Sequence, residues 1–197
     1  MDWGPDIETL LCTAADQAQV RESLHRKSYY RYKKLTHCFS LPIIVLSALS
    51  GSLQFLSKGV DKELEQRIVT CTASLSILTA VISSVSSYLK LGEQMSRHEA
   101  AANQWLLFYS ELQYTLSLAR EKRCPAEEFL NQVKTTTDRL FEISPICSAS
   151  MIARLKKKIR ANAHEDFVVP PALNGWAHMR AFVEGSEQDF EDNSEQG

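Results

Sequence analysis

Two long segments of the chain, residues 35–57 and 68–89, carry no Asp, Glu, Lys or Arg. The only titratable side chains in the first segment are His37 and Cys38. A helix rises about 1.5 Å per residue, so either segment is long enough to cross a hydrocarbon layer of about 30 Å. The pattern predicts two transmembrane helices that are joined into a hairpin by the polar turn 58–67.

A competing interpretation is that both segments are buried helices of a large soluble bundle. Residues 68–89 contain nine Ser or Thr, and the first segment contains Pro42 and Gln54. However, a chain of 197 residues is too short to enclose two helices of this length. Hydroxyl groups are also tolerated in lipid, because they can hydrogen-bond within their helix or to a neighbouring helix. The membrane interpretation is therefore favoured.

Charges beside the two segments predict their orientation. Residues 21–34 contain six basic residues and one acid, whereas the turn 58–67 has three of each. The short turn places both ends of the hairpin on one side, and the positive-inside bias makes that side cytosolic. We expect the flanking bases to contact lipid headgroups, in an anionic leaflet. The predicted headgroup residues are Arg26, Lys27, Arg31, Lys33, Lys34, Lys90, Lys156, Lys157 and Lys158.

Small and polar residues recur at helical spacing along both predicted spans. These residues are Ser40, Ser47, Gly51 and Gln54 in the first span, and Thr72, Ser76, Thr79, Ser83 and Ser86 in the second. In lipid, such residues mark helix contact faces, because small side chains let backbones approach. They could instead line a polar pore. No charged residue lies within either span, which favours packing, and we expect a homo-oligomer.

The remaining sequence predicts a cytosolic helical bundle that extends from the hairpin. Residues 1–34 form an amphipathic helix that runs directly into the first span. Residues 90–161 contain a heptad-like face from Leu91 to Ala119, in which Gly92 is the one candidate interruption. A second helix is expected after Cys124-Pro125. Trp105 lies too far from the membrane boundary to be an interfacial anchor and is expected in the core. The predicted fold class is an all-α membrane protein.

The end of residues 90–161 is a basic amphipathic helix. It could lie on an anionic leaflet, reinforce the basic belt before the first span, contact nucleic acid or be a solvated helix end. Beyond it, residues 162–197 form a linker and a tail with six acids and no bases after Arg180. Trp176 and Phe182 are the expected anchors for a partner protein.

Composition then excludes several classes of function. A net charge of −2 argues against a general nucleic-acid binder. The five cysteines include no CxxC pair, and the histidines have no metal-ligand spacing to them or to each other, so we expect no metal and no cofactor. No pattern of nucleophile, base and orienting group appears, and the protein is expected to be non-enzymatic. Cys38, beside the basic flank, is a candidate for palmitoylation.

Three stretches carry a resemblance to a known family: HRKSYYRYKK at 25–34, RHEAAANQWLLFYSEL at 97–112 and DRLFEISPIC at 138–147. Over about residues 8–160 the chain resembles the SLATT superfamily of two-transmembrane effector domains, which accompany nucleotide-sensing modules and have relatives in large eukaryotic DNA viruses. The resemblance implies a non-enzymatic, oligomeric protein that perturbs membranes or forms pores. The acidic tail and the lack of a fused sensor domain depart from that pattern.

Two functions are therefore expected. In the first, the protein self-associates in a membrane as an effector or pore. In the second, it is a structural protein of a large DNA virus particle, in an internal virion membrane, and its bundle and tail bind capsid or scaffold proteins.

Overall fold

The computed structural model describes residues 3–57 and 59–162, and this part of the chain contains helices and no strand. The predicted all-α fold class is thus confirmed for these residues. The elements are α1 Pro5–Leu56, α2 Lys62–Tyr88, α3 Leu91–Ser117, the short 3₁₀ helix η1 Arg120–Lys122, α4 Ala126–Ile143 and α5 Ala149–Asn162.

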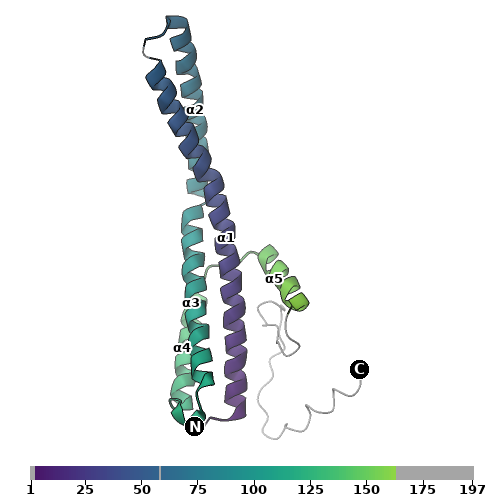
Figure 1. Cartoon of the computed structure of the whole chain (residues 1–197). Coiled ribbons are helices and arrows are strands. Elements are labelled where there is room, and N and C mark those ends of the chain that lie inside the picture. The colour runs from purple at the N-terminus through teal and green to yellow at the C-terminus, as the bar shows by residue number, and fades with distance from the viewer. Residues whose placement is uncertain (1–2, 58, 163–197) are drawn as a thin grey trace.

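Helix α1 forms one long side of a narrow rod (Figure 1). Helices α2 and α3 follow each other back along it, α2 beside the C-terminal half of α1 and α3 beside its N-terminal half. Helix α4 packs against α3, and α5 lies against α1 on the side of the bundle. The rod therefore has two parts, a two-helix hairpin at one end and a helical bundle at the other.

The 52 residues of α1 join these two parts without a break. Pro5 occupies the first turn, where a missing N–H costs nothing, and Asp6 and Glu8 add negative charge at the positive end of the helix dipole. No Gly or Pro follows until Pro42. The prediction that the amphipathic helix runs directly into the first apolar segment is confirmed.

A local break separates α2 from α3 at the end of the second apolar segment. Lys90 adopts a left-handed conformation (φ 48°), which no other non-glycine residue of the described chain shares. Its N–H donates to the carbonyl of Ser87 at 3.1 Å. The sequence suggested Gly92 as the interruption, but Gly92 lies inside α3. The break instead coincides with the first charged residue after the apolar segment.

The core of the bundle is built by the heptad-like face of α3, as predicted. Trp105 and Leu112 are almost fully buried, together with Leu11 of α1 and Phe129 and Leu140 of α4. The indole Nε1 of Trp105 donates to the hydroxyl of Ser144 at 2.9 Å, so its polar edge keeps a partner inside the core.

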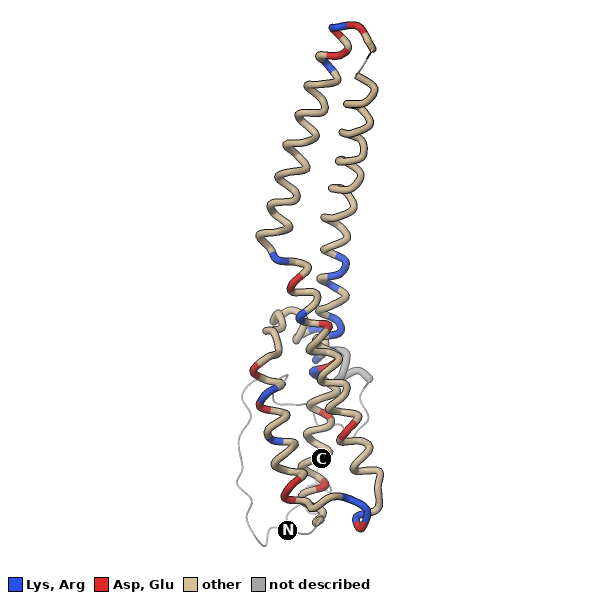
Figure 2. Tube along the Cα trace, turned by 90° about the vertical axis from the view of Figure 1, so that its left-hand side faces the viewer, with Lys and Arg blue, Asp and Glu red and all other residues tan. Residues whose placement is uncertain are grey.

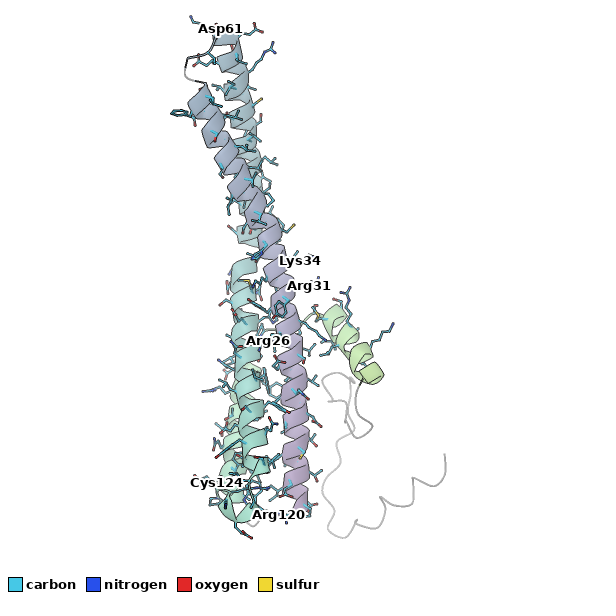
Figure 3. All side chains as sticks on the ribbon, viewed as in Figure 1. Arg26, Arg31, Lys34, Asp61, Arg120 and Cys124 are labelled. Carbon is cyan, nitrogen blue, oxygen red and sulfur yellow. The ribbon has the colours of Figure 1, made fainter. Side chains whose placement is uncertain are left out.

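An ion-pair cluster fastens the start of α1 to the turn between α3 and α4. Both oxygens of Glu8 accept hydrogen bonds from Arg120, at 2.9 and 2.7 Å, and Oε1 also accepts one from Arg123 at 2.6 Å. The indole Nε1 of Trp3 donates to the carbonyl of Cys124 at 2.9 Å. Figure 3 places Arg120 and Cys124 at the end of the rod opposite the hairpin tip.

We expect Leu112→Ala to destabilise the bundle by about 2–5 kcal/mol, because it removes a fully buried side chain and leaves a cavity. The matched control is Leu107→Ala on the same helix, where the side chain is 70% exposed and the change should stay within about 0.5 kcal/mol. Denaturation followed by circular dichroism in detergent micelles measures both variants. Equal losses would contradict this description of the core.

Hydrogen bonds from Arg120 and Arg123 lower the pKa of Glu8 from 4.5 to about 2. A lowered pKa in the folded state means that the pairing stabilises the fold above about pH 4.5 and is lost as the pH falls towards 2. We therefore expect Glu8→Gln to lower the melting temperature at neutral pH, and its difference from the wild type to shrink across that window. Glu121→Gln, an exposed carboxylate in the same turn, is the control. A constant difference at every pH would contradict the assignment.

Candidate membrane hairpin and basic collar

The hairpin exposes its apolar side chains along its whole length. Among the described residues from 29 to 90 none is buried, and Ile44, Phe55 and Ile77 are 62%, 77% and 67% exposed. No charged residue lies between the bases near Lys34 and Lys90 and the charged tip (Figure 2). Both helices are long and apolar enough to cross a membrane. The described part of the bundle does not bury these segments, because it stops short of them.

The seam between α1 and α2 is formed by half-buried residues at alternating steps of four and three. These are Phe39, Ile43, Leu46, Ser50 and Leu53 in α1, and Ile68, Thr72, Leu75, Thr79, Ile82 and Ser86 in α2. In α2 the seam contains Thr72, Thr79 and Ser86 of the predicted polar stripe. In α1 it contains none of the predicted stripe residues and is formed by the apolar side of the helix together with Ser50. Alternating large and small side chains fill the space between two helices better than hydroxyl-bearing residues alone.

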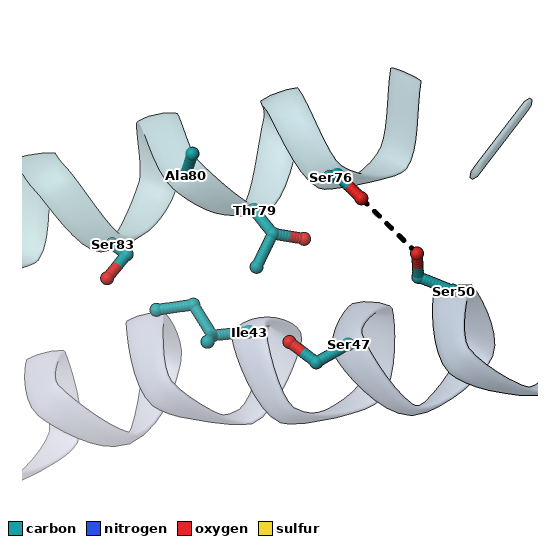
Figure 4. Close-up of a pocket in the computed structure, with 7 residues that line it drawn as sticks. All are labelled: Ile43, Ser47, Ser50, Ser76, Thr79, Ala80 and Ser83. Carbon is teal, nitrogen blue, oxygen red and sulfur yellow. Dashed lines mark hydrogen bonds between the residues drawn. The ribbon is translucent and has the colours of Figure 1, made fainter. Parts of the chain in front are cut away.

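A groove of about 420 Å³ opens beside this seam (Figure 4). Ser47, Ser76 and Ser83 line it, and the hydroxyls of Ser50 and Ser76 lie 3.3 Å apart across the two helices. Gln54 and Thr72 line a second groove closer to the tip. Much of the predicted stripe therefore faces grooves that no part of the described chain fills.

The other stripe residues differ in position. Ser40 is half-buried but lines neither groove. Gly51 makes no close helix contact within this hairpin, because a Cβ at that position would meet no atom within 4 Å. The hydroxyls of Thr72 and Thr79 donate to carbonyls of their own helix at 2.8 Å, which satisfies them without water.

A group of exposed bases, here called the basic collar, lies on both helices of the hairpin where it meets the bundle. It consists of Arg31, Lys33, Lys34 and Lys90, all with exposed side chains. Figure 3 shows Arg31 and Lys34 on α1 at this level and Asp61 at the opposite end of the hairpin. The collar supplies positive charge at one end of the apolar surface.

Two other predicted headgroup residues, Arg26 and Lys27, are half-buried and lie on the part of α1 that belongs to the bundle. Arg26 donates to Glu22 at 2.8 Å and to Asn103 at 3.3 Å. Lys27 also interacts with another residue of the protein. The contacts of Arg26 hold its guanidinium group at the bundle surface, below the basic collar.

Helix α5 is docked on the bundle. Met151 and Leu155 are buried against Val20 and Leu24 of α1. Met151 and Leu155 of the apolar face, which could have lain on a leaflet, are therefore covered by α1 in this structure.

The charged positions of α5 are only partly described. Lys156 is half-buried and Lys157 is exposed, whereas the side chain of Lys158 lies outside the described residues. Trp176, Phe182 and the rest of the predicted tail also lie outside them.

A buried polar cluster lies between the collar and the bundle core. His25 of α1 and His98 of α3 face each other with their Nδ1 atoms 3.0 Å apart, and the Sγ of Cys147 lies 3.7 Å from Nδ1 of His25. Sequence spacing missed this cluster because the histidines are 73 residues apart and Cys147 is 122 residues from His25. The sequence feature that could have pointed to a buried histidine was the position of His98 on the heptad-like face of α3.

Burial sets the protonation of this cluster. It lowers the pKa of both histidines, that of His25 to about 4, where the positive charges of His98 and Arg21 add to the effect. Burial also raises the pKa of the Cys147 thiol. At neutral pH the three groups are therefore uncharged.

No family model, no curated protein and no solved structure matches this chain. The resemblance to the SLATT superfamily consequently stays a prediction.

Proposed function

We propose that the protein is a two-pass integral membrane protein that self-associates in the bilayer as an effector, with its helical bundle on the cytosolic side. The observation that carries the proposal is the exposed, uncharged hairpin, of which no described residue is buried. Exposed apolar surface on this scale needs a cover, and lipid supplies one for a helix pair whose backbone is hydrogen-bonded within each helix.

The basic collar supports this orientation. Arg31, Lys33, Lys34 and Lys90 lie at the level where the apolar surface ends, and the turn at the other end of the hairpin has balanced charge. Bases near an anionic leaflet contribute about 1 kcal/mol each, so the collar would hold the hairpin at a defined depth on the cytosolic side.

The grooves support self-association. In lipid, apolar side chains gain nothing by leaving one hydrocarbon environment for another, so helix pairs are joined by close packing and by hydrogen bonds between hydroxyls. Ser47, Ser76 and Ser83 line an open groove whose walls lack a filling helix within the described chain. A hairpin from a second copy, with the same small polar side chains, would fill it.

The orientation can be tested by thiol labelling in a background in which the other exposed cysteines, Cys38, Cys71 and Cys124, are replaced by Ser. Val60→Cys places a thiol at the hairpin tip, and Cys12 already provides an exposed thiol on the bundle. In intact cells, a membrane-impermeant maleimide should label the tip thiol at once. Cys12 should react only after the membrane is permeabilised.

Cys12→Ser is the control that assigns the second signal. Labelling of Cys12 in intact cells would overturn the orientation. A separate test asks whether alkaline carbonate releases the protein from the membrane fraction. Such release would overturn the membrane proposal itself.

Self-association can be tested on one helix. Ser76→Leu with Ser83→Leu fills the groove, and we expect at least a tenfold weaker association between donor- and acceptor-labelled copies in vesicles, measured by energy transfer. Ser74→Leu is the matched control, because Ser74 lies about 200° around α2 from the seam residue Thr72. Equal effects of the two variants, or no energy transfer in the wild type, would contradict the proposal.

Pore formation is a narrower form of the same proposal. Leakage of a small dye from vesicles that contain the wild type, and its loss in the groove variant, would indicate that the assembled grooves enclose water. The alternative prediction is a structural role in an internal virion membrane. Its expected anchors, Trp176 and Phe182, lie outside the described residues, so the structure does not bear on it.

A further inference from the structure

Three separate segments bring metal-ligating atoms together inside the bundle. His25 comes from α1, His98 from α3, and Cys147 from the segment between α4 and α5. One ligand atom from each residue lies within 4.8 Å of the other two. His25 and His98 are only 2% and 1% exposed, so the cluster is enclosed by protein.

The distances suit a tetrahedral ion. Zinc bonds of about 2.05 Å to nitrogen and about 2.3 Å to sulfur imply edges of roughly 3.3 Å between two nitrogens and roughly 3.6 Å between nitrogen and sulfur. The two Nδ1 atoms are 3.0 Å apart, and Sγ lies 3.7 Å from Nδ1 of His25. Two edges thus match within a few tenths of an ångström, and the third pair of ligand atoms lies within 4.8 Å.

The chemistry of the donor set is that of a borderline-soft divalent ion. Two imidazoles and one thiolate are typical zinc ligands, and three protein ligands leave a fourth position for water. The Tyr32 ring stacks on His98 with centroids 5.4 Å apart and so limits the rotation of that imidazole.

Binding has a proton balance. The short distance between the two Nδ1 atoms implies that one neutral imidazole carries its proton on Nδ1 and donates it to the other. That proton must move to Nε2 of its own ring before both Nδ1 atoms can donate lone pairs to an ion. The Cys147 thiol must also lose its proton to become a ligand. Burial raises the pKa of this thiol, and the nearby Arg21 charge offsets only part of that effect.

We propose that His25, His98 and Cys147 form a site for one zinc-class divalent ion, which fastens the start of α5 to α1 and α3. Cys147 lies two residues before α5, whose Met151 and Leu155 already pack on α1. Occupation of the site would therefore stabilise the docking of the basic helix. The site belongs to the bundle and is independent of whether the hairpin crosses a bilayer.

The test uses the full chain in detergent micelles after chelator treatment. Titration with Co²⁺ should give one ion per chain and a thiolate-to-cobalt charge-transfer band. Competition with a chromogenic chelator should give the affinity for Zn²⁺. In addition, Zn²⁺ should raise the melting temperature, because it binds the folded state.

Cys147→Ser should abolish the charge-transfer band and weaken Zn²⁺ binding at least tenfold. His37→Gln and Cys124→Ser, which change an exposed histidine and an exposed cysteine, should bind as the wild type does. If Cys147→Ser loses helical content, His98→Gln provides the second variant. The proposal is overturned if the wild type binds no ion, or if these ligand variants bind as tightly as the wild type.

Discussion

A long apolar surface that the described part of the chain leaves uncovered is the constraint on which this structure depends. Helix α1 continues without a break from the bundle into the hairpin, and α2 pairs with it along a single seam. A two-helix pair has only one contact face, so the rest of each helix remains exposed. The functional interpretation of the bundle, the basic collar and the grooves depends on what covers that surface.

The bundle and the hairpin follow different packing rules although they share α1. In the bundle, the seam contains large side chains such as Trp105 and Leu112, and a third helix covers it. In the hairpin, the α2 side of the seam alternates Ile and Leu with Thr and Ser, the α1 side is mostly apolar, and no third helix of the described chain is present. This difference is expected where water drives burial at one end of a rod and close packing joins helices at the other.

The exposed ends of the bundle are held by polar contacts. Glu8 joins the start of α1 to the turn after α3, and Trp3 adds a hydrogen bond to the carbonyl of Cys124. At the opposite end, the cluster of His25, His98 and Cys147 lies just below the basic collar. A metal ion there would tie together the three segments that meet beneath the hairpin.

The sequence by itself determined the helices, the uncharged segments and the heptad-like face, because charge gaps and periodicity are local signals. Tertiary structure decided which face of each span forms the seam, that α5 docks through Met151 and Leu155, and that His25 meets His98 and Cys147. These outcomes depend on the rotation and register of helices that are distant in the chain. Spacing along the sequence contains no record of either, so only the assembled bundle could bring a cysteine 122 residues away to His25.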